Sequence, residues 1–266
     1  MPIIPSIPIV PSSQERFGTL AYDVMHHVFA IHDEYGRFCD ELIYKRELAR
    51  RMAGLELEVR IDVIHDSFTK TYFADAIADR TGLFEFKAAE TIHPRHIAQA
   101  THYLLLLGLH HGKVINMRTE SVEHQFVNIQ SKLSDLRNPE INDTLCMSNS
   151  PGARELRDLF LGLISDWGSG LDITLYEEAI TYLLGGDSVV FNKIPINGTG
   201  GELAHQHMRL AHPNSVFKIT AFTPGSPSQS NFRVHAQKLL NHTPLQFIQW
   251  INVQQKEITF TTIQRE

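Results

Sequence analysis

The sequence repeats one plan of helices and strands, and this repeat constrains the fold more than any other feature. Residues 35–44 (YGRFCDELIY) align without a gap over residues 167–176 (WGSGLDITLY), and shorter matches follow in the same order. These shorter matches are Phe86-Lys87 with Phe217-Lys218, Ile115-Asn116 with Ile251-Asn252, and residues 128–130 with residues 262–264. Each half of the 266-residue chain has the length of a typical domain. The repeat therefore predicts two tandem copies of one fold.

Hydrophobic periodicity predicts the order of elements in the first half. A spacing of three to four residues between apolar positions indicates a helix, and strict alternation indicates a strand. The predicted helices cover residues 12–36, 40–54 and 93–108, and the predicted strands cover residues 55–63, 68–79, 83–89, 113–117 and 123–129. This order lacks the regular strand–helix alternation of Rossmann folds and barrels. It predicts an α/β sandwich with a central mixed β-sheet.

Local composition predicts where each domain begins and ends. Residues 1–13 are rich in proline, which cannot form the apolar helix of a signal peptide, and we interpret them as a tail. Residues 134–152 are rich in Asn, Asp, Ser and Pro, which is typical of a linker. The two domains are then expected at residues 14–133 and 153–266.

Charge and cysteine content narrow the class of protein. The net charge of −6 argues against a protein that coats nucleic acid, because non-specific binding needs a surface rich in Lys and Arg. The two cysteines, Cys39 and Cys146, are too few for a disulfide framework and favour a reducing compartment. No apolar run approaches the ~20 residues of a membrane span. We expect a cytoplasmic protein without a membrane partner, whose two domains pair with each other.

Three polar residues in the first half are predicted to converge on one hairpin. Glu85 and Lys87 are separated by one residue on a strand, so their side chains point to the same side of the sheet. The turn near Arg80 folds the preceding strand back, which places Asp75 opposite them. The competing interpretation of this triplet is a ladder of salt bridges on the protein surface.

A further carboxylate lies on the predicted second helix. Glu41 shares one helical face with Tyr44, Leu48 and Met52. A carboxylate on an apolar face is costly unless it is paired or bound to a metal. We therefore expect Glu41 to be largely buried and directed at the acids of the hairpin.

Carboxylates gathered in this way suit a hard divalent cation. Mg²⁺ prefers oxygen ligands and usually keeps several waters, and Mn²⁺ accepts similar ligands. A bound ion polarises a phosphate group and lowers the pKa of an attacking water. A neighbouring lysine can orient that water and offset the charge of the transition state. The pattern predicts hydrolysis of phosphodiester bonds with Mg²⁺ or Mn²⁺.

With these motifs, residues 20–130 resemble the PD-(D/E)XK nuclease superfamily and, within it, the GxxExxY family. The matching residues are Glu41 and Tyr44 of the ExxY motif, Asp75, Glu85 and Lys87 of the nuclease core, and Gln99 and Tyr103 of the QxxxY motif of RecB-like nucleases. One position departs from the pattern, since Phe38 stands where the family name has glycine.

The resemblance implies a restriction-endonuclease-like fold and a metal-dependent nuclease, with DNA favoured over RNA as its partner. It also implies roles for the matched residues. Asp75 and Glu85 are expected to bind the metal, Glu41 to hold a metal-bound water or a second ion, Lys87 to position the nucleophile, and Tyr44, Gln99 and Tyr103 to brace the site or contact the substrate.

The second half lacks the acids at the aligned positions. The alignment places Ile173 at Glu41, Gln206 at Asp75, Val216 at Glu85 and Lys218 at Lys87. A site without carboxylates cannot hold the metal, so the second half is predicted to be a degenerate copy. The alternative function is a non-catalytic binding or regulatory protein on a nuclease-derived fold, which the acidic charge and the degenerate half favour.

Overall fold

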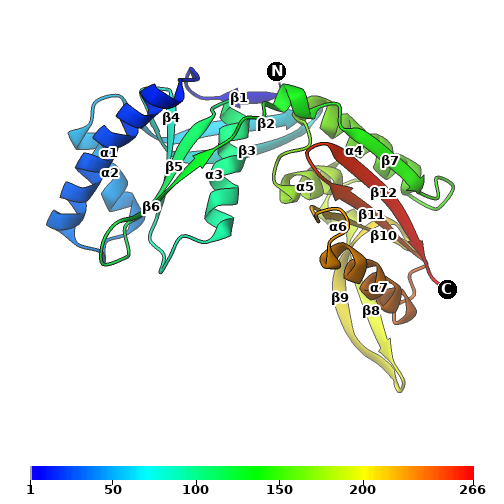
Figure 1. Cartoon of the computed structure of the whole chain (residues 1–266). Helices are drawn as coiled ribbons and strands as arrows, with labels where there is room; N and C mark the ends of the chain where they lie inside the picture. Colours follow the sequence, from blue (N-terminus) through cyan, green and yellow to red (C-terminus); the bar gives the residue numbers. More distant parts are fainter. Residues whose placement is uncertain (1) are drawn as a thin grey trace. The chain divides into compact units, whose positions relative to one another are not determined.

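The computed structural model describes residues 2–266 and forms two compact domains (Figure 1). The N-terminal domain ends at Leu133 and the C-terminal domain begins at Ser134. Each is built on a mixed sheet of six strands, which confirms the predicted α/β class. Within residues 2–266, no helix is long and apolar enough to cross a membrane.

The N-terminal domain has three helices and six strands. The helices are α1 (Gln14–Tyr35), α2 (Glu41–Arg51) and α3 (Pro94–Leu107), and the strands are β1 (Ile3–Pro5), β2 (Leu55–His65), β3 (Phe68–Ala78), β4 (Gly82–Lys87), β5 (His111–Asn116) and β6 (Glu123–Asn128). The strands lie in sequence order, and every neighbouring pair is antiparallel except β4 and β5. Parallel neighbours need a crossover connection, which α3 provides.

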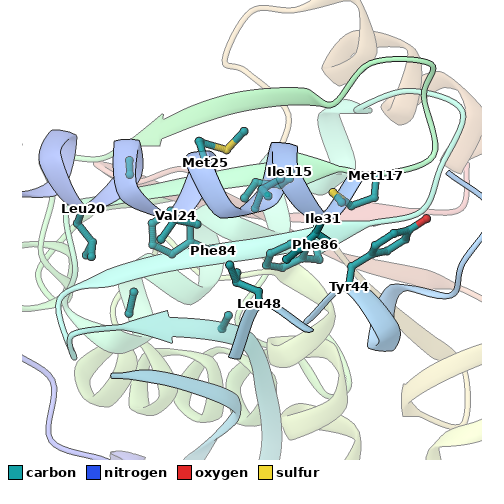
Figure 2. Close-up of a cluster of buried hydrophobic side chains, with 14 of the residues drawn as sticks. Leu20, Val24, Met25, Ile31, Tyr44, Leu48, Phe84, Phe86, Ile115 and Met117 are labelled. Atoms are coloured by element: carbon teal, nitrogen blue, oxygen red, sulfur yellow. The ribbon is translucent and has the colours of Figure 1, made fainter. Parts of the chain in front are cut away.

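Helices cover both faces of this sheet. The apolar stripes of α1 and α2 pack on the face that carries Phe84 and Phe86 (Figure 2). Helix α3 covers the other face (Figure 1). There, Leu104 of α3 and Leu83 of β4 both lie close to Gly112. Because side chains alternate along a strand, the remaining side chains of β4 belong to the α3 face. The candidate acids are therefore separated from the main apolar core.

The C-terminal domain has four helices and six strands. The helices are α4 (Ala153–Trp167), α5 (Ile173–Leu183), α6 (Asp187–Val190) and α7 (Pro227–Asn241), and the strands are β7 (Glu140–Leu145), β8 (Phe191–Gly198), β9 (Gly201–His212), β10 (Ser215–Thr220), β11 (Phe247–Val253) and β12 (Glu257–Gln264). A short 3₁₀ helix, η1 (Leu133–Leu136), precedes β7. The sheet order is β7-β12-β11-β10-β9-β8.

Five strands follow the same plan in both domains. Strands β8 to β12 have the order of β2 to β6, with one parallel pair, β10 and β11, connected by α7. The sixth strand differs, because β1 lies beside β2 whereas β7 lies beside β12. The repeated plan is thus present in the topology, with the extra strand on opposite edges.

The two extra strands arise from segments that the sequence predicts to be irregular. Strand β1 lies within the expected tail and pairs Ile3 with Val63. Strand β7 lies within the expected linker and pairs with β12. Both are edge strands, where proline and short length are tolerated. Their structure comes from pairing with an exposed sheet edge, which local composition does not reveal.

Candidate active site

The candidate site lies where β3 and β4 separate. Their ladder of backbone hydrogen bonds ends at the Ala76–Phe84 pair. Beyond it, carboxylates take the place of backbone acceptors. The Asp75 N–H donates to Glu85 Oε1 at 3.2 Å, and the Phe86 N–H donates to Asp75 Oδ2 at 2.9 Å. The two acids are therefore fixed by the backbone of the opposite strand.

Lys87 completes the hairpin cluster. Its Nζ lies 3.3 Å from Glu85 Oε2 and 3.4 Å from Asp75 Oδ2. Glu85 is fully buried, and the side chains of Asp75 and Lys87 are nearly so. The structure thus brings together the three residues that the strand spacing and the hairpin turn predict to converge. Their burial distinguishes the cluster from a ladder of salt bridges on an exposed strand.

A second lysine, which the sequence analysis missed, lies among the acids. Lys45 on α2 is only 5% exposed. Its Nζ lies 2.7 Å from Asp75 Oδ1, bonds to the Glu58 carboxylate, and lies 3.7 Å from Glu41 Oε1. One ammonium group therefore faces three carboxylates. The available signal was its spacing of four residues from Glu41, which puts the two side chains on one helical face.

Glu58 is a further acid that the sequence did not reveal. It lies on β2, where the ladder to β3 pairs its neighbours, Leu57 with Ala76 and Val59 with Ala74. Its φ of 51° is uncommon for a residue with a side chain and costs ~1–3 kcal/mol. Strained backbone of this kind clusters at functional sites. At Glu58 it accompanies the contact with Lys45.

Glu41 lies at the edge of the cluster. It is the first residue of α2, and 33% of its side chain is exposed, so the expectation that it is largely buried is wrong. The reason is its place at the start of the helix, one turn before the buried Lys45. Its carboxylate is still close enough to interact electrostatically with Asp75 and Lys87.

Tyr44 does not face the acids. Its ring is buried in the apolar core between α1, α2 and the sheet. Its hydroxyl points away from the other side chains of this core (Figure 2). The hydroxyl donates to the Gly36 carbonyl at 2.8 Å and accepts from the Cys39 N–H at 3.0 Å. Tyr44 therefore braces the turn between two helices, and a contact with substrate is not supported by its position.

Gln99 and Tyr103 lie together on α3. The Gln99 Nε2 donates to the Tyr103 hydroxyl at 3.4 Å. Burial raises the pKa of Tyr103, and the nearby charges of Glu85 and Asp75 raise it further. The pair therefore lines the α3 side of the acidic cluster.

Burial and mutual repulsion change the proton affinity of the acids. Burial, and then the charge of Asp75, raises the pKa of Glu85 to about 8. The same two causes raise the pKa of Glu41. Burial lowers the pKa of Lys45, but its hydrogen bonds to Asp75 and Glu58 outweigh this and raise the pKa overall. The site thus holds more negative charge than its lysines balance.

The acids are suited to a divalent cation by their chemistry. Within residues 2–266, no three Asp, Glu, His or Cys side chains converge closely enough to form a metal centre, and at this site Lys45 and Lys87 contact the carboxylates instead. All the candidate ligands are carboxylate oxygens, as Mg²⁺ and Mn²⁺ prefer. A bound cation would lower the raised pKa of Glu85, because positive charge favours the ionised carboxylate. The residues therefore fit the ion, provided that Lys45 releases Asp75.

The turn between α4 and α5 is built like the turn between α1 and α2. The Tyr176 hydroxyl donates to the Gly168 carbonyl and accepts from the Leu171 N–H. Tyr44 makes the same two contacts in the N-terminal domain. This contact therefore places Tyr176 at the position of Tyr44.

The parallel strands also share a contact. The Asn116 side chain on β5 accepts from the Ala89 N–H and donates to the Ala89 carbonyl. The Asn252 side chain on β11 does the same with Phe222. Asn116 and Asn252 are therefore equivalent residues, and they show which strand positions of the two domains correspond.

The register assigns the C-terminal counterparts of the site residues. Lys87 on β4 and Thr220 on β10 each pair with the asparagine of the neighbouring strand. Thr220 therefore takes the place of Lys87. Two residues earlier, Lys218 takes the place of Glu85.

The alignment expected from the sequence is wrong on these strands. It predicts Gln206 at the place of Asp75, Val216 at that of Glu85 and Lys218 at that of Lys87. Each pairing is displaced by two residues, because the Phe-Lys dipeptides match in sequence but not in strand register. Val216 pairs with Leu210, so Met208 faces Lys218 across the hairpin as Asp75 faces Glu85. The expectation that no carboxylate lies at these strand positions still holds.

Comparison with known proteins gives a match within the N-terminal domain. Residues 18–129 match the family model of the PD-(D/E)XK nuclease superfamily. The match begins within α1, ends just after β6 and contains all the candidate site residues. Comparisons with curated proteins and with solved structures found no match.

Proposed function

Because residues 18–129 match the family model of the PD-(D/E)XK nuclease superfamily, we propose that this protein is a metal-dependent nuclease. It would hydrolyse phosphodiester bonds of nucleic acid at the N-terminal site. The observation that carries the proposal is the convergence of Asp75, Glu85 and Lys87 in a buried cluster within the matched region. An ordinary surface ion pair would not bury a carboxylate completely.

Asp75 and Glu85 are the proposed metal ligands. They are fixed by backbone N–H groups of the facing strands, so their carboxylates are oriented before an ion arrives. A bound Mg²⁺ or Mn²⁺ would supply Lewis acidity toward the phosphate and acidify a bound water. Glu41, one-third exposed at the edge of the cluster, would hold a metal-bound water or a second ion.

Lys87 is proposed to position the nucleophile. Its Nζ lies within 3.4 Å of both buried acids, so it can hold an attacking water beside them. It can also offset the negative charge that grows on the phosphate oxygens. Gln99 and Tyr103 line the same side and would contact the substrate backbone. Tyr44 contributes indirectly, by fixing the start of α2.

Lys45 is proposed to stabilise the site before the ion binds. It neutralises Asp75 and Glu58 through short contacts that exclude a second cation from the same oxygen atoms. Occupation of the site then requires the Lys45 ammonium to leave Asp75 Oδ1. The lysine thus sets the affinity for the ion without being one of its ligands.

The C-terminal domain is proposed to be a degenerate copy of the N-terminal one. It keeps the helix-turn contact of Tyr176 and the strand contact of Asn252. At the places of the four central residues it carries Ile173, Met208, Lys218 and Thr220, none of which is a carboxylate. Cleavage is therefore assigned to the N-terminal domain alone.

A cleavage assay on the full chain tests the proposed function. Labelled single- and double-stranded DNA and RNA are incubated with the purified protein in Mg²⁺, Mn²⁺ or EDTA. We expect strand cleavage with either ion, with DNA preferred to RNA, and no cleavage in EDTA. Binding without cleavage of every substrate in both ions would reject the nuclease and support the non-catalytic alternative.

A further inference from the structure

The C-terminal domain has a cavity at the place of the N-terminal acids. It lies between α7 and the β9–β10 hairpin and has a volume of about 310 Å³. Its lining includes Met208, Arg209, Val216, Lys218, Phe232 and Ala236. Met208 and Lys218 stand at the places of Asp75 and Glu85, so the cavity is the counterpart of the candidate active site.

The helix that covers the cavity confirms this correspondence. Helix α7 begins with a proline in its first turn, as α3 does. Counted from that proline, Phe232 takes the place of Gln99. Ala236, one turn later, takes the place of Tyr103, and the smaller side chain leaves space. At these positions the C-terminal domain has apolar or small side chains where the N-terminal domain has polar ones.

The wall of the cavity is aromatic and held in place. The Phe232 ring packs against Trp250, with centroids 4.6 Å apart, and against Phe222 at 5.8 Å. Met208 adds a polarisable surface next to it. The volume lies at the lower end of the ~300–1,000 Å³ typical of ligand sites. Such a space suits one flat ring system better than a peptide or a large metabolite.

The rim of the cavity carries uncompensated positive charge. Lys218 and Arg209 lie 2.9 Å and 3.3 Å from the carboxylate oxygens of Glu177, so two cations share one anion. The Arg209 guanidinium also lies over the Phe191 ring, 4.6 Å from its centroid. Its buried Nε has no acceptor among the described residues. An anionic ligand would add the negative charge that this rim lacks.

We propose that this cavity binds one unstacked base of a nucleic-acid single strand. The base would stack on the wall formed by Phe232 and Met208, and the adjacent phosphate would contact Lys218 and Arg209. Aromatic walls beside positive charge are the usual means of binding single strands without sequence preference. The bases of a duplex remain stacked and do not enter. This inference rests on the proposed function, because it makes the degenerate domain the part that holds the nuclease substrate.

Binding in EDTA tests the cavity separately from cleavage. The probe is a fluorescent oligothymidylate of about twelve nucleotides, long enough for one such site, and anisotropy reports its dissociation constant for the full chain. Ala236→Tyr fills the cavity with the side chain that the N-terminal domain has at this place. Lys218→Gln removes an exposed charge from the rim. Lys256→Gln, at an exposed turn between β11 and β12, is the charge-matched control.

We expect Ala236→Tyr and Lys218→Gln each to weaken binding by about tenfold, the size of one lost base contact. The control should bind like the wild type, and a duplex of the same length should bind more weakly than the single strand. Unchanged binding in both cavity variants would overturn the inference. An equal loss in Lys256→Gln would overturn it too, because it would show binding by bulk charge.

The outcomes for the two domains are distinguishable. Loss of single-strand binding in the cavity variants, with no cleavage by the wild type in any ion, would retain the cavity and reject the nuclease. Cleavage by the wild type, with unchanged binding in both variants, would retain the nuclease and reject the cavity. A thermal melt shows whether Ala236→Tyr folds. If it does not fold, Lys218→Gln, which changes an exposed position, still tests the cavity.

Discussion

At the scale of residues, Lys45 partly balances the negative charge of the site. Its ammonium group lies 2.7 Å from Asp75 Oδ1 and contacts Glu58, so it supplies the positive charge that these acids need. A divalent ion and an ammonium group compete for the same carboxylate oxygens. Under the proposed function, the lysine stabilises the folded chain and, at the same time, weakens the binding of the ion.

Lys45→Met is predicted to raise the affinity for Mn²⁺ and to lower the melting temperature in EDTA. Affinity should rise by about tenfold or more, because unit charges ~4 Å apart interact by ~1–4 kcal/mol. Stability should fall because Asp75 loses its buried partner. Isothermal titration calorimetry and thermal melts measure the two effects.

Lys113→Met is the matched control, because Lys113 is also buried but packs over the Phe126 ring, 3.9 Å from its centroid. Its Mn²⁺ affinity should equal that of the wild type. Weaker or unchanged Mn²⁺ binding in Lys45→Met would show that Lys45 does not compete with the ion.

Glu85 gives the ion-free protein a predictable dependence on pH. Burial and the charge of Asp75 raise its pKa from 4.5 to about 8, with Glu41, Lys45 and Lys87 nearby. Between these values the folded protein keeps a proton that the unfolded chain releases. The free energy of unfolding should therefore fall as the pH rises through this range.

Glu85→Gln removes this titration. In EDTA, its melting temperature should change less with pH across that range, and at its upper end should exceed that of the wild type. Thermal melts at a series of pH values measure both. Parallel curves for the two proteins would mean that Glu85 is ionised in the folded state throughout.

The sequence predicts the residues whose positions follow from strand geometry. Asp75, Glu85 and Lys87 are found because side chains alternate along strands and a hairpin turn sets their register. Lys45 is missed because a helical lysine is normally solvated, and only the fold shows that it is buried. Glu58 is missed because its contact depends on a left-handed backbone.

At the scale of elements, a tyrosine makes the same contacts at the turn between paired helices in both domains. Tyr44 and Tyr176 each bond the carbonyl of the glycine that ends the preceding helix. The contact fixes the angle at which the second helix enters. In the N-terminal domain this helix carries Glu41 and Lys45 into the site.

Tyr176→Phe should destabilise the C-terminal domain by ~1–3 kcal/mol, because the buried Gly168 carbonyl loses its donor. Tyr44→Phe should destabilise the N-terminal domain by less, because Gly36 is exposed and water can replace the lost donor. Both tryptophans, Trp167 and Trp250, lie in the C-terminal domain, so tryptophan fluorescence reports only its unfolding. Tyr176→Phe should shift that transition, whereas Tyr44→Phe should shift only a transition seen by circular dichroism. Loss of Mn²⁺ binding in Tyr44→Phe without loss of stability would show that Tyr44 acts directly in the site.

Helices α2 and α5 provide a natural comparison for Glu41. The C-terminal domain has Ile173 at the corresponding first position. Glu41→Ile should therefore fold, with a melting temperature in EDTA at or above that of the wild type. Its stabilisation by Mn²⁺ should be smaller, because binding to the folded state is weaker. Equal Mn²⁺-induced shifts in both proteins would remove Glu41 from the site.

Most helices and strands can be predicted from the sequence, but the pairing of the edge strands and the register between strands cannot. The order of two helices, three strands, a helix and two strands follows from hydrophobic periodicity. The edge strands β1 and β7 could not be predicted, because short strands acquire their structure from a neighbour. The predicted alignment of the C-terminal strands is displaced because two Phe-Lys dipeptides coincide in sequence, whereas backbone pairing aligns Lys218 with Glu85.

At the scale of the whole molecule, one topology supports two different local arrangements. The N-terminal domain has a buried acidic cluster with two lysines, whereas the C-terminal domain has an apolar cavity with a cationic rim. Contacts that build the scaffold are shared, and the side chains at the corresponding positions differ. Because the net charge is −6, the proposed function requires local features, and not a basic surface, to hold nucleic acid.

Cleavage by Glu85→Ala and Lys87→Ala, measured together with stability, tests the central claim most directly. Initial rates on the preferred substrate are determined in Mg²⁺ for the wild type and both variants, and melting temperatures in EDTA. Each substitution should lower the rate by about a hundredfold or more, as expected for lost transition-state stabilisation. The melting temperatures should fall only slightly. Removal of Glu85 also removes its repulsion from Asp75, and in Lys87→Ala the Lys45 ammonium remains as the partner of Asp75. Unchanged cleavage with a large fall in melting temperature would contradict the account, because Asp75, Glu85 and Lys87 would then be a structural ion-pair cluster and not an active site.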